Sequence, residues 1–149
     1  MIKVNVLGMD KALGDIKRYA DGVGERVEKE LKVTAQLVRN DAIKNAPVNK
    51  RIGEGGQLRR FIVADPVRNY ETAVVSQAKY SEFVEYGTGD LGRNPKGDHT
   101  TKKRWVYFDE LSREFRIGRP QRPRPFMFPA AEANRRGHAQ RIAKALKKK

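Results

Sequence analysis

A long, regular apolar stripe occupies the first third of the chain and constrains its fold more than any other feature. After Asp10, a good N-cap residue, apolar side chains recur at steps of three and four, which is the spacing of one helix face. The pattern ends at Ala46-Pro47, because a residue before proline is pushed out of the helical region. The stripe consists of Leu13, Ile16, Ala20, Val23, Val27, Leu31, Ala35, Val38 and Ala42.

The predicted helix, from about residue 11 to residue 46, is too long for a small domain to cover. At 1.5 Å per residue it would measure roughly 50 Å. We therefore expect part of its apolar face to meet another chain. Gly22 and Gly24 weaken the middle of this segment, so a kink or a break into two helices is an alternative to one straight helix.

Short β-branched and aromatic runs predict strands on either side of this helix. Residues 2–7 alternate apolar and polar side chains and predict a short N-terminal strand. Residues 58–63 and 72–76 predict one antiparallel pair, because Asp65-Pro66 and Asn69 mark a turn between them. Residues 104–108 and 115–117 predict a second antiparallel pair.

The remaining elements complete an α+β fold. Residues 78–86 predict a short helix or turn, and a closing helix is expected from about residue 129 to residue 146, with Pro129 in its first turn and Glu132 near its positive dipole end. The order of elements does not alternate, so we predict a small antiparallel β-sheet flanked by a long N-terminal and a shorter C-terminal helix. At 149 residues this is a single domain, residues 1–149, with a β-rich core at about 58–128.

The charge is strongly basic and unevenly placed. The chain has 32 Lys and Arg against 18 Asp and Glu, a net charge of +14. After Glu132 the chain has only basic charges, ending in Lys147-Lys-Lys149. Such a field attracts polyanions or acidic protein surfaces. For the tail itself we favour a solvated helix end over a nucleic-acid contact.

The composition argues against a metal, a cofactor and a membrane span. The chain has no cysteine and only two distant histidines, His99 and His138, so no metal is expected. The glycines of residues 87–92 match G-x-G-x-x-G, but Arg93-Asn-Pro cannot begin the helix that a dinucleotide needs, so no cofactor is expected. No apolar run approaches the ~18 residues of a span, and the N-terminus lacks a signal-peptide layout. We expect a soluble protein that starts inside a cell.

The acidic residues do not predict an enzyme. A nuclease-like cluster could be imagined from side chains around residues 82–99, but carboxylates on a turn and a loop lack the rigid support that catalysis needs. We interpret them as solvated loop charges, and no serine has an activating partner in the sequence. The cluster comprises Glu82, Glu85, Asp90, Asp98 and His99.

Basic and aromatic residues alternate near the second strand pair and allow two interpretations. Residues 102–108 resemble a stacking platform for single-stranded nucleic acid, with Trp105 and Tyr107 on one face of the strand. Alternation also places Val106 and Phe108 on the opposite face, so we expect half of these side chains in the core. Candidate contacts to DNA or to an acidic partner are Lys102, Lys103, Arg104, Trp105, Arg119 and Arg122.

A proline-stiffened strip precedes the closing helix. In Arg124-Pro-Phe-Met-Phe-Pro129 the prolines hold the backbone extended, which places Phe126 and Phe128 on the same side. We expect one of these phenylalanines to anchor the closing helix against the sheet, beside Tyr80, Phe83 or Tyr86. Charge reversals in the basic tail should leave folding nearly unchanged.

Four segments, taken in order, resemble a family of tailed-bacteriophage proteins, the head-tail joining or tail completion proteins of the neck of long-tailed phages. They are Ala42-Ile-Lys-Asn-Ala-Pro47-Val, Gly56-Gln-Leu-Arg59, Ala78-Lys-Tyr-Ser-Glu-Phe-Val-Glu-Tyr-Gly-Thr88 and Arg124-Pro-Phe-Met-Phe-Pro-Ala-Ala-Glu132. The resemblance spans about residues 35 to 135. The loops at residues 49–57 and 93–103 are longer than in such proteins.

The resemblance implies a non-enzymatic virion protein that assembles in the host cytoplasm into a homo-oligomeric ring, a hexamer by analogy. Its partners would be other neck or tail proteins (the head-closure ring, the tail terminator or the tail tube), with DNA as a further contact. The alternative is a sequence-nonspecific nucleic-acid-binding protein that uses basic loops and Trp105 and Tyr107. Interface or structural roles are expected for Tyr80, Phe83, Glu85, Tyr86, Gly87, Thr88, Arg124, Pro125, Phe126, Phe128 and Pro129.

Overall fold

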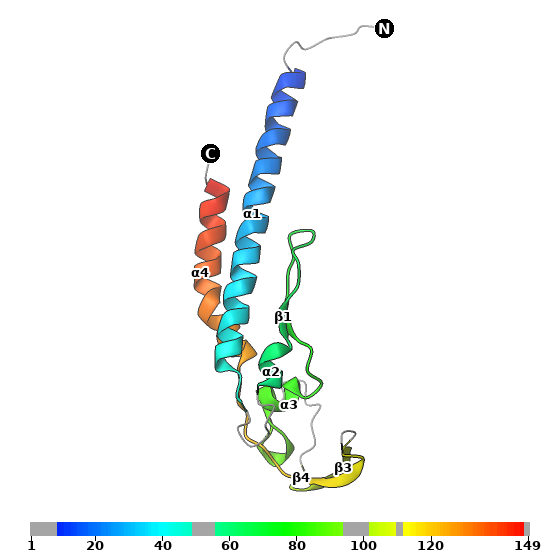
Figure 1. Cartoon of the computed structure of the whole chain (residues 1–149). Helices are drawn as coiled ribbons and strands as arrows, with labels where there is room; N and C mark the ends of the chain where they lie inside the picture. The colour runs from blue at the N-terminus through cyan, green and yellow to red at the C-terminus, as the bar shows by residue number, and fades with distance from the viewer. Residues whose placement is uncertain (1–8, 49–55, 94–101, 110–111, 148–149) are drawn as a thin grey trace, which may run out of the picture.

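The computed structural model describes residues 9–48, 56–93, 102–109 and 112–147. Two helices form a stalk, one hairpin rises along it, and the short helices and the other hairpin gather at one end of it (Figure 1). This arrangement confirms the α+β class, but the strands form two separate two-stranded sheets instead of a single one. The strand predicted at residues 2–7 lies outside the described residues. Within the described part, no helix is long and apolar enough to span a membrane.

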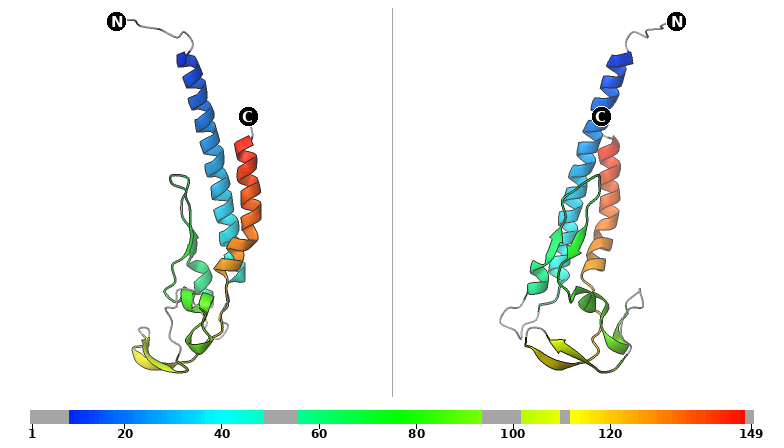
Figure 2. Two further views of the ribbon diagram at one scale, coloured as in Figure 1. Left: turned by 180° about the vertical axis from the view of Figure 1, so that it is seen from behind. Right: turned by 90° about the vertical axis from the view of Figure 1, so that its right-hand side faces the viewer.

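The stalk pairs helix α1 (Met9–Asn45) with helix α4 (Met127–Lys147). The two run antiparallel, and α4 follows only the C-terminal part of α1 in every view (Figures 1 and 2). The prediction of one long helix is confirmed, and the alternative of a break at Gly22 and Gly24 is wrong, because α1 is continuous. Gly24 instead gives room to a neighbour: a Cβ atom there would lie 2.6 Å from Oη of Tyr70.

Polar contacts set the register between α1 and α4. Asn134 Nδ2 donates a hydrogen bond to Asp41 Oδ2 at 2.8 Å. Two helical turns from Asp41 along α1, Thr34 Oγ1 lies 3.0 Å from His138 Nδ1 and accepts a hydrogen bond from Arg141 at 2.9 Å. A one-turn slip would separate all these partners, so the ladder specifies how the helices align.

The first hairpin lies along α1 and joins strand β1 (Ile62–Ala64) to strand β2 (Val74–Ser76). The strands are antiparallel, with Val63 opposite Val75. At its tip, Asn69 and Tyr70 both have positive φ, which is the backbone of a tight hairpin turn. The predicted strand at residues 58–63 is wrong in its first half, because Gln57–Arg60 forms the short helix α2.

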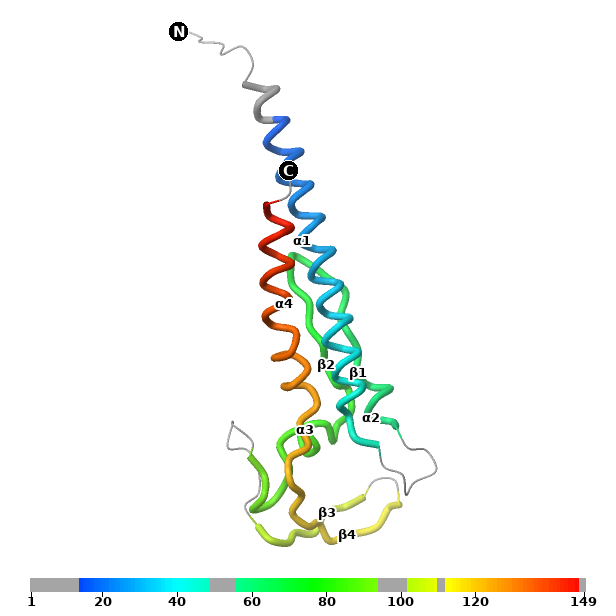
Figure 3. Tube along the Cα trace, turned by 90° about the vertical axis from the view of Figure 1, so that its left-hand side faces the viewer, coloured from blue at the N-terminus to red at the C-terminus, as the bar shows by residue number. Residues whose placement is uncertain are grey.

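The second hairpin lies beyond the other elements, at the end of the molecule opposite the free end of α1 (Figure 3). Strand β3 (Trp105–Asp109) pairs antiparallel with strand β4 (Glu114–Gly118), as predicted. Helix α3 (Ser81–Tyr86) and the 3-10 turn η1 (Gly89–Leu91) lie between the two hairpins in sequence. The short helix predicted within residues 78–86 is therefore confirmed.

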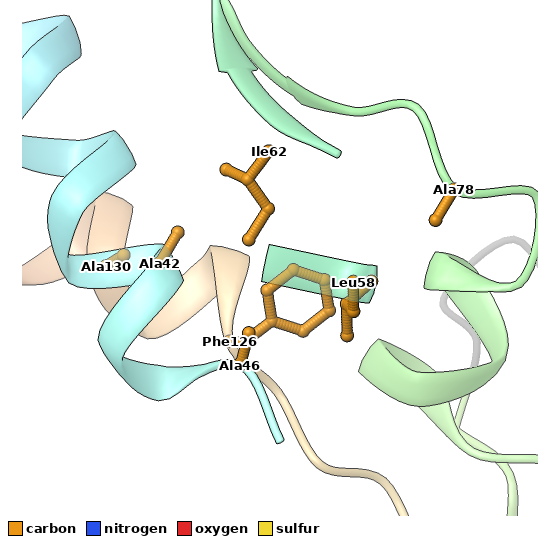
Figure 4. Close-up of a cluster of buried hydrophobic side chains, with 7 residues drawn as sticks. All are labelled: Ala42, Ala46, Leu58, Ile62, Ala78, Phe126 and Ala130. Carbon is orange, nitrogen blue, oxygen red and sulfur yellow. The ribbon is translucent and has the colours of Figure 1, made fainter. Parts of the chain in front are cut away.

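The core is small and is built around one aromatic ring (Figure 4). Phe126 and Ile62 are the largest fully buried side chains among the described residues. Alanines let the surrounding backbones approach this ring closely, since they add little bulk of their own. The cluster contains Ala42, Ala46, Leu58, Ile62, Ala78, Phe126 and Ala130.

We predict that Phe126→Ala lowers the melting temperature sharply. Truncating a fully buried phenylalanine costs about 3–5 kcal/mol, a large share of the roughly 5–15 kcal/mol that stabilises a domain. Phe128→Ala is the matched control, because Phe128 is 69% exposed. Thermal unfolding followed by circular dichroism should separate the two variants, and equal melting temperatures would contradict the assignment of Phe126 as the centre of the core.

Candidate functional site

The carboxylate of Glu85 joins helix α3 to the first turn of α4. Glu85 is only 6% exposed. Its Oε2 accepts hydrogen bonds from the backbone N–H groups of Phe126 at 2.7 Å and Met127 at 3.0 Å, and its Oε1 accepts one from Phe128 at 2.9 Å. A single side chain thus binds three successive amides, and the interpretation of Glu85 as a solvated loop charge is wrong.

These contacts complete the N-terminus of α4. The first four N–H groups of a helix have no partner within the helix. Here Glu85 binds three of them, and the fourth residue is Pro129, which has no N–H. The negative charge also lies at the positive end of the helix dipole. Hydrogen bonds to a charged group are worth about 1.5–3 kcal/mol each, which offsets the cost of burying the carboxylate.

The residues after Glu85 cross the chain that leads into α4. Gly87 has φ of 74° and ψ of −174°, a conformation essentially restricted to glycine. A Cβ atom on Gly87 would collide with the carbonyl oxygen of Gln121. Thr88 then pairs with Gln121 through backbone hydrogen bonds of 2.9 and 3.2 Å, and the Arg124 N–H donates to the Val84 carbonyl at 2.8 Å.

Helix α2 connects the core to the C-terminus of α1. Leu58 is buried in the cluster, while the Arg59 side chain turns to the C-terminus of α1. Arg59 Nε donates to the Ala46 carbonyl at 2.9 Å and Nη2 donates to the Lys44 carbonyl at 3.4 Å. A cation there satisfies carbonyl groups that the helix leaves without partners and complements its negative dipole end.

The four segments that carry the family resemblance therefore meet in one place. We call this place the motif junction: Ala42 and Ala46, α2, Glu85 to Thr88, and Phe126 to Pro129. The sequence did not predict the capping roles of Glu85 and Arg59, because the backbone groups that these side chains bind lie far from them along the chain.

Several predicted positions differ in detail. Phe126 is buried and Phe128 is exposed, so they do not share one side: the backbone turns into α4 two residues before Pro129 instead of staying extended. Of the three expected neighbours of the buried ring, Tyr80 and Phe83 are exposed and only Tyr86 lines the same groove as Phe126, while the buried residue from this segment is Ala78. Glu132 does not lie in the first turn of α4 and pairs instead with Arg135 at 3.5 Å. Arg124, Pro125 and Pro129 are exposed, and Tyr86 is half-buried.

The second hairpin carries an apolar surface that we call the hairpin patch: Val106, Phe108, Phe115 and Ile117. Val106 lies opposite Ile117 and Phe108 opposite Phe115, so all four side chains share one face. The two phenylalanine rings meet edge to face with centroids 5.3 Å apart. The four residues are 51–76% exposed. The expectation that half of this strand is core is therefore wrong.

The opposite face of the hairpin is more polar. Trp105 is half-buried and its indole ring lies against Gly118, where a Cβ atom would overlap it. Arg116 pairs with Asp109 at 3.0 Å. The alternative of nucleic-acid stacking on Trp105 and Tyr107 gains no support from this packing. The proposed contacts of the exposed basic residues with DNA or an acidic partner stay predictions, and these residues are Lys102, Lys103, Arg104, Arg119 and Arg122.

An open groove of about 690 Å³ runs beside the motif junction. We call it the helix–strand groove, because α1 and β2 line it together with α3 and the start of α4. Its lining is mostly apolar and includes Leu31, Ala35, Val38, Val74, Val75 and Met127.

We predict that Glu85→Gln destabilises the fold by about 2–3 kcal/mol, because a neutral amide presents an N–H₂ group to amides that need an acceptor. Glu82→Gln is the matched control: it lies on the same helix but is exposed, so its effect should stay within about 0.5 kcal/mol. Urea unfolding of both variants measures the difference. If the two variants unfold at the same urea concentration, Glu85 does not hold α4.

We predict that Gly87→Ala destabilises the protein by at least about 1–3 kcal/mol, the usual cost of a strained backbone conformation. The collision with Gln121 adds to this cost. Gly14→Ala is the control, since nothing lies within 4 Å of a Cβ atom at this helical position and alanine is favoured there by about 1 kcal/mol. Chemical denaturation should give shifts of opposite sign, and a neutral Gly87→Ala would refute the close crossing.

Comparison with known protein families identifies the family of this chain. The family described as "Bacteriophage HK97-gp10, putative tail-component" matches residues 10–87, more than half of the sequence. The chain therefore belongs to this HK97-gp10-like family, which confirms the resemblance to tailed-phage proteins. The matched region runs from the start of α1 through Gly87. Searches of curated proteins and of solved structures found no match.

Proposed function

We propose that this HK97-gp10-like protein is a non-enzymatic component of the phage neck, which completes the tail and joins it to the head as part of a homo-oligomeric ring. The family match over residues 10–87 carries the proposal, because that family is one of phage tail components. The ring, its six copies and its position in the neck extend the match by analogy with the resemblance seen in the sequence.

Exposed apolar surfaces support an assembly role. The hairpin patch leaves four large apolar side chains in contact with solvent. Ile16 and Tyr19 of α1 are also exposed, N-terminal to Arg26, whose side chain donates to the Ala145 carbonyl near the end of α4. Contiguous apolar surface of this kind marks protein interfaces in soluble proteins. A ring of subunits would cover both regions and would explain why α1 is much longer than its partner.

The position of Glu85 supports a structural role for this carboxylate. A general base must be able to reach a substrate proton, whereas both oxygens of Glu85 accept backbone hydrogen bonds inside the fold. The basic surface of the second hairpin suits an acidic neighbouring neck protein, such as a head-closure ring or a tail terminator, or DNA in the channel.

A phage deleted for this gene tests the proposal. We expect electron microscopy of the lysate to show complete heads and complete tails that remain separate, and expression of the protein from a plasmid to restore joined virions. Light scattering of the assembled protein should give six times the mass of the 17.0 kDa chain. Normal virions from the deletion strain would refute a role in joining.

A further inference from the structure

We propose that the hairpin patch of one copy docks in the helix–strand groove of the next copy. This inference rests on the proposed ring and names the contact that would build it. The partner is a second copy of this chain, and the contact is heterologous, because the patch and the groove are different surfaces of one molecule. Repeating such a contact around an axis produces a closed ring when the rotation between neighbouring copies closes.

The second hairpin needs a partner. A two-stranded hairpin is at best marginally stable in water, and β3 and β4 pack mainly on each other among the described elements. Its face still carries Val106, Phe108, Phe115 and Ile117, which are 51–76% exposed. Burying apolar area is worth roughly 25 cal/mol per Å². Covering this face would therefore stabilise both the hairpin and the complex.

The groove offers a surface of matching chemistry. Its floor comes from the apolar side of α1, with Leu31, Ala35 and Val38, and β2 adds Val74 and Val75. At about 690 Å³ it falls within the size range of binding pockets in proteins. Phe128, which is 69% exposed, also lines it. The groove thus holds an apolar side chain that the fold itself leaves uncovered.

Charge complementarity favours the second copy as the occupant. The described residues 102–109 and 112–122 contain seven basic side chains and two acidic ones. On the other side, Glu82 lines the groove, and Asp65 and Glu71 lie with one basic residue, Arg68, beside Thr72 and Ala73 at its β1–β2 end. Three exposed carboxylates and one arginine, a net negative charge, would therefore face the basic surroundings of the patch. In a chain of net charge +14, this pairing brings copies together where most other surfaces would repel.

The two surfaces are also free to meet on different molecules. Figure 3 shows the second hairpin projecting below α3, whereas α1, β2 and α4, which line the groove, rise above it. A subunit can therefore present its patch to one neighbour while its groove receives the patch of the other.

Cysteine cross-linking tests the contact directly, because the chain has no cysteine of its own. Purified Phe115→Cys protein, labelled on the patch, is mixed with Val75→Cys protein, labelled in the groove, and oxidised. The control mixture pairs Phe115→Cys with Leu146→Cys, an exposed apolar position near the end of α4. We expect about tenfold more mixed dimer than in the control, since docking raises the effective concentration of the two thiols.

Two results overturn the inference. One is an equal yield of mixed dimer with Val75→Cys and Leu146→Cys. The other is a dominant Phe115→Cys homodimer, which would mean that patches meet each other. Either result leaves the proposed function standing if the same protein restores joined virions to the deletion phage. As a second arm, Phe115→Ser should abolish oligomers while circular dichroism shows that the monomer stays folded, whereas Leu146→Ser, at an exposed apolar position near the end of α4, should leave oligomers intact.

Discussion

The fold depends on one buried carboxylate that binds the start of a helix 41 residues away in sequence. Glu85 supplies the acceptors that the first amides of α4 lack, and the absence of an N–H on Pro129 completes the arrangement. Because the same turn carries Phe126, the hydrogen bonds of Glu85 also position the ring at the centre of the core. The hydrogen bonds to the first amides of α4 and the packing of apolar side chains around Phe126 therefore support each other at the motif junction.

A core of this size explains the distribution of the other apolar residues. Four of the seven residues in the central cluster are alanines. The backbones therefore approach Phe126 and Ile62 closely, and few large side chains are needed to fill the core. The polar ladder between α1 and α4 aligns the stalk. Large side chains of the second hairpin and of the free part of α1 are left on the surface. The buried cluster thus lies at one end of the stalk, and large apolar side chains remain exposed elsewhere.

Local pattern was enough to predict much of this architecture. The apolar spacing predicted α1, the β-branched and aromatic runs predicted the β3–β4 pair, and the prolines around Phe126 and Phe128 indicated a buried phenylalanine. The errors have physical causes. Residues 58–60 look like a strand, but burial of Leu58 and the contacts of Arg59 with α1 favour a helical turn. Gly24 made a kink an alternative, because the sequence alone does not reveal the tertiary contact with Tyr70 that this glycine makes room for. Likewise, the capping by Glu85 joins residues that only the folded chain brings together.

Amide hydrogen exchange at the start of α4 tests the central claim most directly. The N–H groups in the first turn of a helix normally exchange quickly, because they lack partners within the helix. If Glu85 binds them, the amides of Phe126, Met127 and Phe128 should exchange as slowly as those in the interior of α4. Exchange of these three amides at the rate of exposed backbone would show that the carboxylate does not hold the helix, and would contradict the structure proposed for the motif junction.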